Sequence, residues 1–256
     1  PDGSQIFLVN HYHKSEAATS QGISWSRKSG SAWSFPENIA IPYFLNRSSL
    51  LSGQLIEDKG IFIYAAESYD TKGAEDIYVS RRDNSGKWNE PRNLGAVINT
   101  TLQEFSPSLS EDQKFLYFSS NGRRGYGSFD VYFSERLDES WQNWSIPANM
   151  GSRINSDGRE LFYRTFPQRN LALYTTTQNS DGYGDIRFYL DSLQKNIPDT
   201  VVKLVEIKRE TTVGKVNFTR MKGSVTSSKT GQPIAAKLDF KADSVYSTNS
   251  NAKGSY

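Results

Sequence analysis

Three aspartates occupy the same place in an internal repeat, and they are the side chains best placed to act together. Asp76, Asp130 and Asp185 each stand at the start of an apolar, aromatic segment. If the copies surrounded an axis, three carboxylates could line a channel and bind a cation or a substrate. Alternatively, each carboxylate could accept hydrogen bonds from backbone N–H groups of a neighbouring turn. We favour this structural interpretation, because a catalytic site normally breaks the symmetry of a repeat.

Other side chains give weaker indications of catalysis or metal binding. His11 and His13 would share one face of a strand, but the sequence offers no third zinc ligand beside them. Loop 179–185 is rich in oxygen but lacks the alternating carboxylates of an EF-hand. Segment 83–88 is similar to the Asp-box of sialidases, although its Asp-to-Gly spacing is too long and segment 137–144 lacks the box. We predict no catalytic residue, no metal site, no cofactor and no enzyme activity.

A long internal repeat positions these groups. The interval from Trp88 to Trp144 equals the interval from Pro91 to Pro147, and Trp33 precedes Trp88 by one position fewer. An exposed tryptophan could form a platform for sugars, but this regular spacing favours packing between neighbouring copies. Each Trp is followed three residues later by a proline, and these are Pro36, Pro91 and Pro147.

Each copy contains four short segments that alternate in polarity, as strands with one or two packed faces do. Turn signals rich in Asn, Asp and Gly separate these segments. Four-stranded repeats of this length are typical of propeller blades, while the repeats of a parallel β-helix are about half as long. The sequence therefore predicts an all-β protein with about four propeller blades. Because the chain opens inside a repeat, we expect five or six blades natively.

Composition narrows the classes of partner. The chain has 256 residues with a formal net charge of +2, which gives no electrostatic basis for nucleic-acid binding. It has no cysteine, so disulfides, zinc–thiolate sites and cysteine nucleophiles are excluded. No apolar run approaches the roughly 18 residues of a membrane-spanning helix.

The repeat resembles the WD40-like repeats of TolB-type propellers, through its aromatic strand, Ser-Ser, Gly-rich loop and Asp-Ile-Tyr-x-Ser order. The extension Trp-x-x-Pro-x-Asn-Leu-Gly-x-x-Ile-Asn-Thr resembles propellers of OmpA-family outer-membrane proteins, some of them associated with type IX secretion. We assign residues 1–190 to the propeller and 191–215 to a connector, with a strand expected at 201–207. Residues 216–256, with Thr230-Gly231-Gln-Pro233 as a hairpin turn and Gly254 before a third strand, resemble an incomplete carboxypeptidase regulatory-like β-sandwich.

This resemblance implies a non-catalytic, protein-binding scaffold in the periplasm, associated with the outer membrane. The implied partner is a protein or peptide of the cell envelope, with a peptidoglycan link through a domain outside this sequence. The alternative is a glycan-binding or glycan-hydrolysing propeller. Gly-rich loops 69–74, 121–128 and 179–184 vary between copies, which suits partner contact. The candidate contact residues are Tyr69, Arg123, Arg124, Tyr126, Trp141 and Tyr183.

Overall fold

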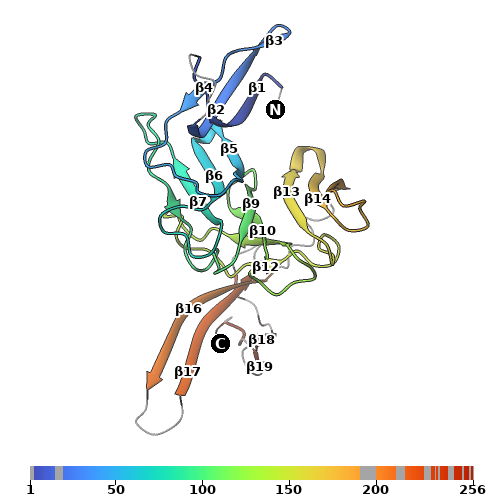
Figure 1. Ribbon diagram of the computed structural model, residues 1–256. Coiled ribbons are helices and arrows are strands. Elements are labelled where there is room, and N and C mark those ends of the chain that lie inside the picture. The colour runs from blue at the N-terminus through green and yellow to red at the C-terminus, as the bar shows by residue number, and fades with distance from the viewer. Residues whose placement is uncertain are drawn as a thin grey trace.

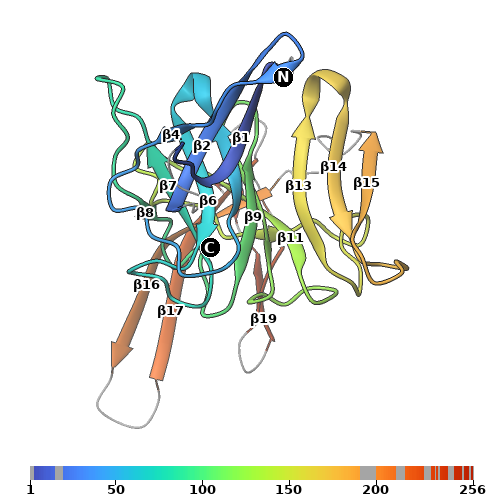
Figure 2. The ribbon, with the colours of Figure 1, turned by 45° about the horizontal axis from the view of Figure 1, so that its top comes forward.

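A computed structural model describes residues 3–14, 20–190, 200–211, 217–227, 232, 233, 235, 237–241, 245–249, 251–253 and 255. Its regular elements are strands, apart from two 3₁₀ turns of three residues each among the described residues. Four sheets are arranged as four blades of a β-propeller (Figures 1 and 2). The predicted all-β propeller fold is therefore confirmed, while the native number of blades stays a prediction.

The blades follow one another along the chain, and every paired strand within them is antiparallel. Blade 1 comprises β1 (Gln5–His11), β2 (Ser20–Ser29), β3 (Ala32–Trp33) and β4 (Glu37–Ile39). Blade 2 comprises β5 (Ser52–Ile56), β6 (Ile61–Ala66), β7 (Asp76–Arg81) and β8 (Arg92–Asn93), with the 3₁₀ turn η1 (Glu57–Lys59) after β5. Blade 3 comprises β9 (Glu104–Leu109), β10 (Phe115–Ser120), β11 (Asp130–Glu135) and β12 (Ala148–Asn149). Blade 4 comprises β13 (Glu160–Phe166), the 3₁₀ turn η2 (Pro167–Arg169), β14 (Leu171–Thr176) and β15 (Asp185–Leu190).

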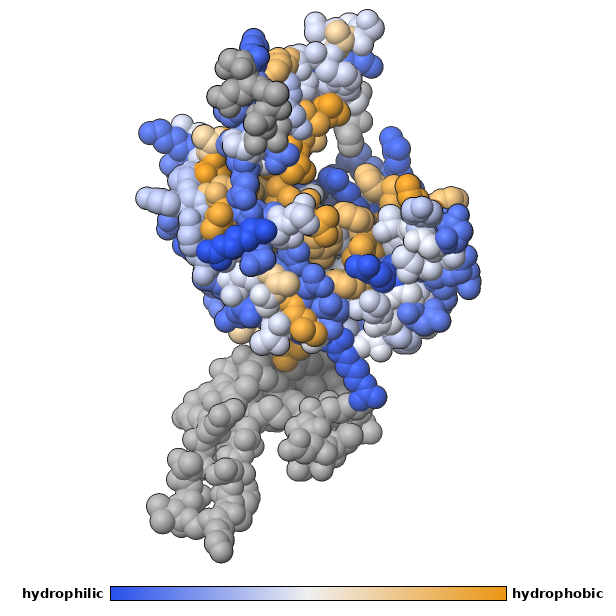
Figure 3. Space-filling view, viewed as in Figure 1, coloured by the Kyte–Doolittle hydropathy of each residue, from blue (hydrophilic) through white to orange (hydrophobic). Residues whose placement is uncertain are grey.

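Apolar side chains on both faces of the blades form cores between neighbouring sheets, because successive residues of a strand point to opposite faces. Ile63 and Ile77 of blade 2 share a buried cluster with Phe118 and Tyr132 of blade 3. A second cluster joins blades 1 and 2, and a third joins blades 3 and 4. Many of the aromatic side chains of the sequence are therefore buried between neighbouring blades. Figure 3 shows further apolar side chains gathered in the hollow between blade 1 and blade 4, with hydrophilic residues around it.

Serine hydroxyls join the inner strands of blades 2, 3 and 4. The hydroxyl of one blade accepts a hydrogen bond from the backbone of the blade that follows it. The hydroxyl of Ser52 accepts a 2.9 Å hydrogen bond from the backbone N–H of Ser106. The hydroxyl of Ser106 in turn accepts one from the N–H of Phe162, also at 2.9 Å. Ser106 and Phe162 have φ values of 46° and 57°, and the pairing register of β9 and β13 shifts beside them. An irregularity in each inner strand therefore turns its backbone toward the preceding blade.

Beyond the blades, the chain forms two separate hairpins in the described residues. The predicted strand at 201–207 lies within β16 (Thr200–Thr211), so part of the expected connector is a long strand. The predicted turn at Thr230 and Gly231 and the expected role of Gly254 lie outside the described residues. The β-sandwich stays a prediction. One hairpin pairs β16 (Thr200–Thr211) with β17 (Asn217–Ser227) and extends away from the blades in Figure 1, and the other pairs β18 (Lys237–Lys241) with β19 (Val245–Asn249).

Candidate functional site

In blades 2 and 3 the repeated aspartate is held by hydrogen bonds of its own blade. The carboxylate of Asp76 accepts the backbone N–H of Lys72 at 3.0 Å and the amide of Asn93 at 2.7 Å. Asp130 likewise accepts from the N–H of Gly127 at 3.2 Å and from Asn149 at 3.1 Å. Burial raises the pKa of Asp76 above its ordinary value, against the opposing effect of these hydrogen bonds. Both carboxylates are thus occupied in holding a loop and a fourth strand to the third strand.

A second asparagine completes this arrangement, and its role was not recognised in the sequence. The side chain of Asn99 accepts the N–H of Ile77 at 2.8 Å and donates to the carbonyl of Ile77 at 3.0 Å. Asn155 makes the same pair of bonds with Val131. The signal available in the sequence was the recurrence of this asparagine at the same offset as the repeated tryptophans of blades 2 and 3.

Two buried glutamates at equivalent positions of the repeat also hold their own blades. Glu104 accepts the N–H of Thr100 at 2.7 Å, the hydroxyl of Thr100 at 2.8 Å and the hydroxyl of Ser120 at 2.7 Å. Glu160 accepts from Ser156 and Thr176 in the same way. Burial raises the pKa of Glu104, although its hydrogen bonds oppose the shift. These carboxylates are fully engaged, so they serve the architecture of the inner strands.

Asp185 differs from its two counterparts. It is exposed, and its side chain has no hydrogen bond within the described parts of the chain. In blades 2 and 3 the aspartate binds an asparagine that lies 17 or 19 residues further on. No such asparagine-bearing strand lies beside β15 in the described residues. The three aspartates therefore do not form one ring of equivalent carboxylates.

Two of the three repeated tryptophans pack between blades, and the third does not. Trp88 lies in a cluster with Ile23 and Ile39 of blade 1, and Trp144 lies in a cluster with residues of blade 2. Trp33 is 42% exposed, which contradicts its expected burial. It would face a blade before the first, and the described chain has none there. The prolines of the motif are half-buried and precede the fourth strands, and these are Pro36, Pro91 and Pro147.

The loops that join second and third strands expose one tyrosine in each of three blades. Tyr69, Tyr126 and Tyr183 are 71%, 55% and 78% exposed, and they are evenly spaced along the chain. Because the loops join equivalent strands, they emerge at the same end of the propeller. Arg124 beside Tyr126 is also exposed. These four predicted contact residues are therefore accessible to a partner.

Arg123 is only partly accessible and is tied to the neighbouring blade. Its guanidinium donates to the carbonyls of Val97 and Ile98 at 2.6 and 2.8 Å. Burial lowers its pKa, while the negative charge of Glu104 opposes the shift. Arg123 thus links the loop of blade 3 to the backbone that follows the fourth strand of blade 2.

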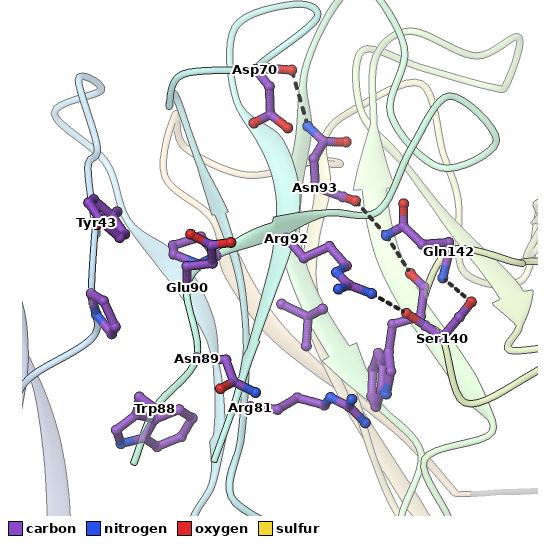
Figure 4. A pocket seen from close by; sticks show the side chains of 14 residues that line it. Tyr43, Asp70, Arg81, Trp88, Asn89, Glu90, Arg92, Asn93, Ser140 and Gln142 are labelled. Atoms are coloured by element: carbon purple, nitrogen blue, oxygen red, sulfur yellow. Dashed lines mark hydrogen bonds between the residues drawn. The ribbon is translucent and has the colours of Figure 1, made fainter. Parts of the chain in front are cut away.

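A pocket of about 620 Å³ opens at the outer edge between blades 2 and 3. Figure 4 shows Tyr43 on one side, Ser140 and Gln142 of blade 3 on the other, and the fourth-strand residues between them. Arg92 donates to the carbonyl of Ser140 at 3.1 Å, and Gln142 donates to that of Asn93 at 2.9 Å. These bonds fix the wall formed by blade 3. Tyr43, which is 74% exposed, comes from the link between blades 1 and 2.

Both signs of charge line the inter-blade pocket. Asp70 and Glu90 supply the carboxylates, and Arg81 and Arg92 supply the guanidinium groups. No ion pair joins these four side chains in the described structure, so each can meet a ligand of opposite charge. Asp70 accepts a 2.8 Å hydrogen bond from the hydroxyl of Tyr78, and burial raises the pKa of that tyrosine to about 12. The pocket therefore presents both charges and some apolar surface.

Trp141 was expected to be exposed, and that expectation is wrong. The residue is 2% exposed, has a φ of 63° and packs edge-to-face on Trp144 with the ring centroids 6.0 Å apart. Its segment is one residue longer than that of blade 2, since Asp138 precedes Trp144 by six residues and Asp83 precedes Trp88 by five. Trp141 lines the pocket, and its buried indole N–H has no hydrogen-bond partner.

The turns before Trp88 and Trp144 are more alike than their sequences indicated. Asp83 accepts the N–H and the hydroxyl of Ser85 at 2.8 and 2.7 Å. Asp138 makes the equivalent bonds with Ser140 at 2.8 and 2.5 Å. Segment 137–144 therefore has an aspartate-capped turn of its own, although it lacks the Asp-box motif. Both turns are structural, since each aspartate accepts a hydrogen bond from the backbone N–H of the serine two residues further on in the turn.

The described residues contain no cluster of three or more His, Asp or Glu side chains suited to a metal ion. His11 bonds with the carbonyl of Ile39 at 3.0 Å, and His13 with the hydroxyl of Ser20 at 3.4 Å. The two histidines therefore have separate partners. In the part of the chain that the structure describes, no helix is long and apolar enough to cross a membrane.

Comparisons with known proteins leave the family open. No protein-family model matches the sequence, and no curated protein matches it. Among solved structures, the chain is similar to a Mycobacterium tuberculosis puromycin-hydrolyzing peptidase, with a TM-score of 0.38 and 13% identity. The match covers 97% of this chain and 41% of the peptidase, so the chain spans less than half of that protein. A likeness of this degree carries no conclusion about activity.

Proposed function

We propose that this chain is a non-catalytic scaffold that binds a protein or peptide. The observation that carries the proposal is the exposed tyrosine that recurs in three neighbouring loops at one end of the propeller. Tyr69, Tyr126 and Tyr183 are each more than half exposed, although a tyrosine normally buries most of its ring. Tyrosine is enriched in protein interfaces because its ring supplies contact area at a small cost in side-chain entropy.

The inter-blade pocket adds a second contact region beside the first. Asp70, which lines the pocket, directly follows Tyr69 in the same loop. A partner that covers this loop can therefore also place a charged side chain beside Arg81 or Arg92. The repeated carboxylates of blades 2 and 3 support a non-catalytic role, because they are already held by hydrogen bonds of their own blades.

The resemblance to TolB-type and OmpA-family propellers supports a more specific form of the proposal. In this form the scaffold lies in the periplasm, associated with the outer membrane, and its partner belongs to the cell envelope or to a type IX secretion complex. A domain outside this sequence would provide the link to peptidoglycan. The carboxypeptidase regulatory-like segment would act as a spacer between the two.

A triple substitution of Tyr69, Tyr126 and Tyr183 to Ala tests the proposal in the native envelope. The matched control replaces Val9, Phe35 and Ile146 by Ala, which are also exposed but lie outside these loops and do not line the inter-blade pocket. We expect proteins that co-purify with the wild type, measured by quantitative mass spectrometry, to fall at least about tenfold with the triple variant and to persist with the control. An unchanged set of proteins with the loop variant would overturn the proposal.

A glycan ligand is the second candidate, and the exposed ring of Tyr43 on one side of a pocket that Arg92 and Gln142 also line is the observation that favours it. Sugars stack on aromatic rings and bind polar side chains around them. Screening of the chain on a glycan array tests this candidate. Binding that is lost with Tyr43→Ala supports it, and an array without signal excludes it for the glycans tested.

A further inference from the structure

Blades 2 and 3 hold their fourth strands by one shared set of contacts. We define the outer segment as residues 91–99 in blade 2 and 147–155 in blade 3. The first asparagine of the outer segment, Asn93 or Asn149, donates to the aspartate that begins the third strand, at 2.7 and 3.1 Å. The last asparagine, Asn99 or Asn155, binds the backbone N–H and C=O of the residue that follows this aspartate, which is Ile77 or Val131. The polar half of the attachment is therefore fixed by two asparagines six residues apart.

The apolar half of the attachment also recurs. Leu94 and Ile98 of the blade 2 outer segment are 0% exposed and belong to the cluster that contains Ile77 and Val79 of the third strand. In blade 3, Ile154 is buried with Val131 and Phe133, and Met150 packs against the same cluster. The outer segment thus contributes one apolar residue after its first asparagine and another before its last one. The outer segments help to cover four residues of the third strands, which are Ile77, Val79, Val131 and Phe133.

Blade 4 has the receiving half of this attachment. Asp185 of β15 pairs with Thr176, as Asp130 of β11 pairs with Ser120. Ile186 and Phe188 follow at the positions of Val131 and Phe133, but they are 75% and 69% exposed. In Figure 2, β15 is the outermost strand of its blade. Within the described residues β15 pairs only with β14, so no described strand covers its outer edge.

We propose that the outer edge of β15 binds an extended segment of a partner polypeptide with the pattern Pro-x-Asn-(Leu/Met)-Gly-x-x-Ile-Asn. The segment adds a fourth strand to blade 4 by backbone pairing. Its first asparagine binds Asp185, its last asparagine binds the backbone of Ile186, and its two apolar side chains help to cover Ile186 and Phe188, as the outer segments do beside the following blade in blades 2 and 3. The two complete outer segments in this same chain specify the chemistry of the occupant.

The occupant is a segment from outside the described blades, because the asparagines of both outer segments already bind their own blades. Residues 191–199 follow β15 in the chain but do not fit the pattern. Asn196 is followed two residues later by Pro198 instead of glycine and six residues later by Val202 instead of asparagine. A second copy of the chain would have to release an outer segment of its own and expose Leu94 and Ile98, or their counterparts, to water.

A synthetic peptide with the sequence of residues 144–157 tests the proposal directly. The fluorescently labelled peptide is titrated into the whole chain, and binding is followed by fluorescence anisotropy. We expect saturable binding that falls at least about tenfold when both Asn149 and Asn155 of the peptide are replaced by Ala, since each makes buried or charge-assisted hydrogen bonds. Hydrogen exchange of the backbone of residues 185–190 should slow when the peptide is present.

Substitutions in the protein locate the peptide. Asp185→Ala should weaken binding at least about tenfold, while the matched control Asp181→Ala on the adjacent loop should leave it unchanged. Both aspartates are exposed, so neither change should alter the unfolding temperature. The absence of binding, or binding that is indifferent to Asp185→Ala or to the two peptide asparagines, would overturn the proposal. So would a dimer of the chain that protects β15 and excludes the peptide.

This inference goes beyond the proposed scaffold function and can fail separately from it. The triple variant of Tyr69, Tyr126 and Tyr183 should still bind the peptide, because none of these residues lies on β15. Retained peptide binding with lost envelope partners would therefore separate the two surfaces.

Discussion

The side-chain amide of Asn99 donates a 2.8 Å hydrogen bond to the side-chain oxygen of Asn93, and Asn155 binds Asn149 at the same distance. The bond ties the residue that binds the aspartate to the residue that binds the third-strand backbone. Blades 2 and 3 thereby each gain a continuous series of hydrogen bonds from the loop to the fourth strand. Such networks are valuable when every member is satisfied and costly when one is removed.

Replacement of Asn99 by Ala should lower the free energy of unfolding by about 3 kcal/mol, because the buried N–H of Ile77 loses its partner and the carbonyl of Ile77 keeps only the N–H of Leu94. Denaturant unfolding followed by tryptophan fluorescence measures the change. The control is Asn84→Ala in an exposed turn, which should change stability by less than about 0.5 kcal/mol. Equal effects of the two substitutions would contradict the structural role of Asn99.

Replacement of Trp144 by Ala should destabilise the protein by about 3–5 kcal/mol, because it opens a cavity between blades 2 and 3. The same change at Trp33, which is 42% exposed, should have less than about a third of that effect. Thermal unfolding of the two variants compares equivalent positions of the repeat. A similar loss of stability at both sites would show that Trp33 is covered in solution.

Replacement of Gly125 by Ala should disturb the loop of blade 3, because a methyl group there would overlap the carboxylate of Asp130. We expect a loss of about 1–3 kcal/mol, the usual range for overpacking. Gly184→Ala is the control, since the nearest atom to an added methyl group is the Cβ of Thr175 at 3.7 Å. Calorimetry should show a lower unfolding temperature for Gly125→Ala alone.

Glu104 should make stability depend on pH in a direction set by its raised pKa. Because burial raises this pKa above its ordinary value of 4.5, the folded state binds the proton more tightly than the unfolded state. The stabilisation from this group is fully present below the ordinary pKa and is lost as pH rises through the folded pKa. The unfolding free energy of the wild type, measured relative to Glu104→Gln, should therefore fall as pH rises above about 4.5.

Asp83 provides a control of opposite sign for the pH experiment. Hydrogen bonds from Ser85 and Lys87 lower its pKa below 3.8, so its contribution is present above that pH and is lost in acid. The difference between wild type and Asp83→Asn should fall as pH is lowered, although it should be small because the side chain is exposed. Parallel pH profiles for the two variants would contradict the opposite shifts.

The repeat made the fold predictable from the sequence, since Trp, Pro, Asn and Gly recurred at one spacing and strand patterns filled the intervals. The buried positions of Trp88 and Trp144 followed from the same spacing. Trp141 could not be placed, because one additional residue in its loop allows a left-handed backbone that turns the indole inward. The inter-blade pocket was also unpredictable, since its walls come from blade 2, from blade 3 and from the link between blades 1 and 2. Asp185 shares its sequence position with Asp130 but lacks the contact to an asparagine side chain, because that asparagine stands far along the chain.

The links between Ser52, Ser106 and Phe162 give the propeller a direction. In each link an earlier blade offers a hydroxyl to the backbone of the blade that follows. A chain that emerges from the ribosome N-terminus first would have each acceptor in place before the strand that needs it is made. A substitution should therefore act on the blade that follows it. The loss of the Ser52 hydroxyl should destabilise the inner strand of blade 3 and leave blade 2 intact.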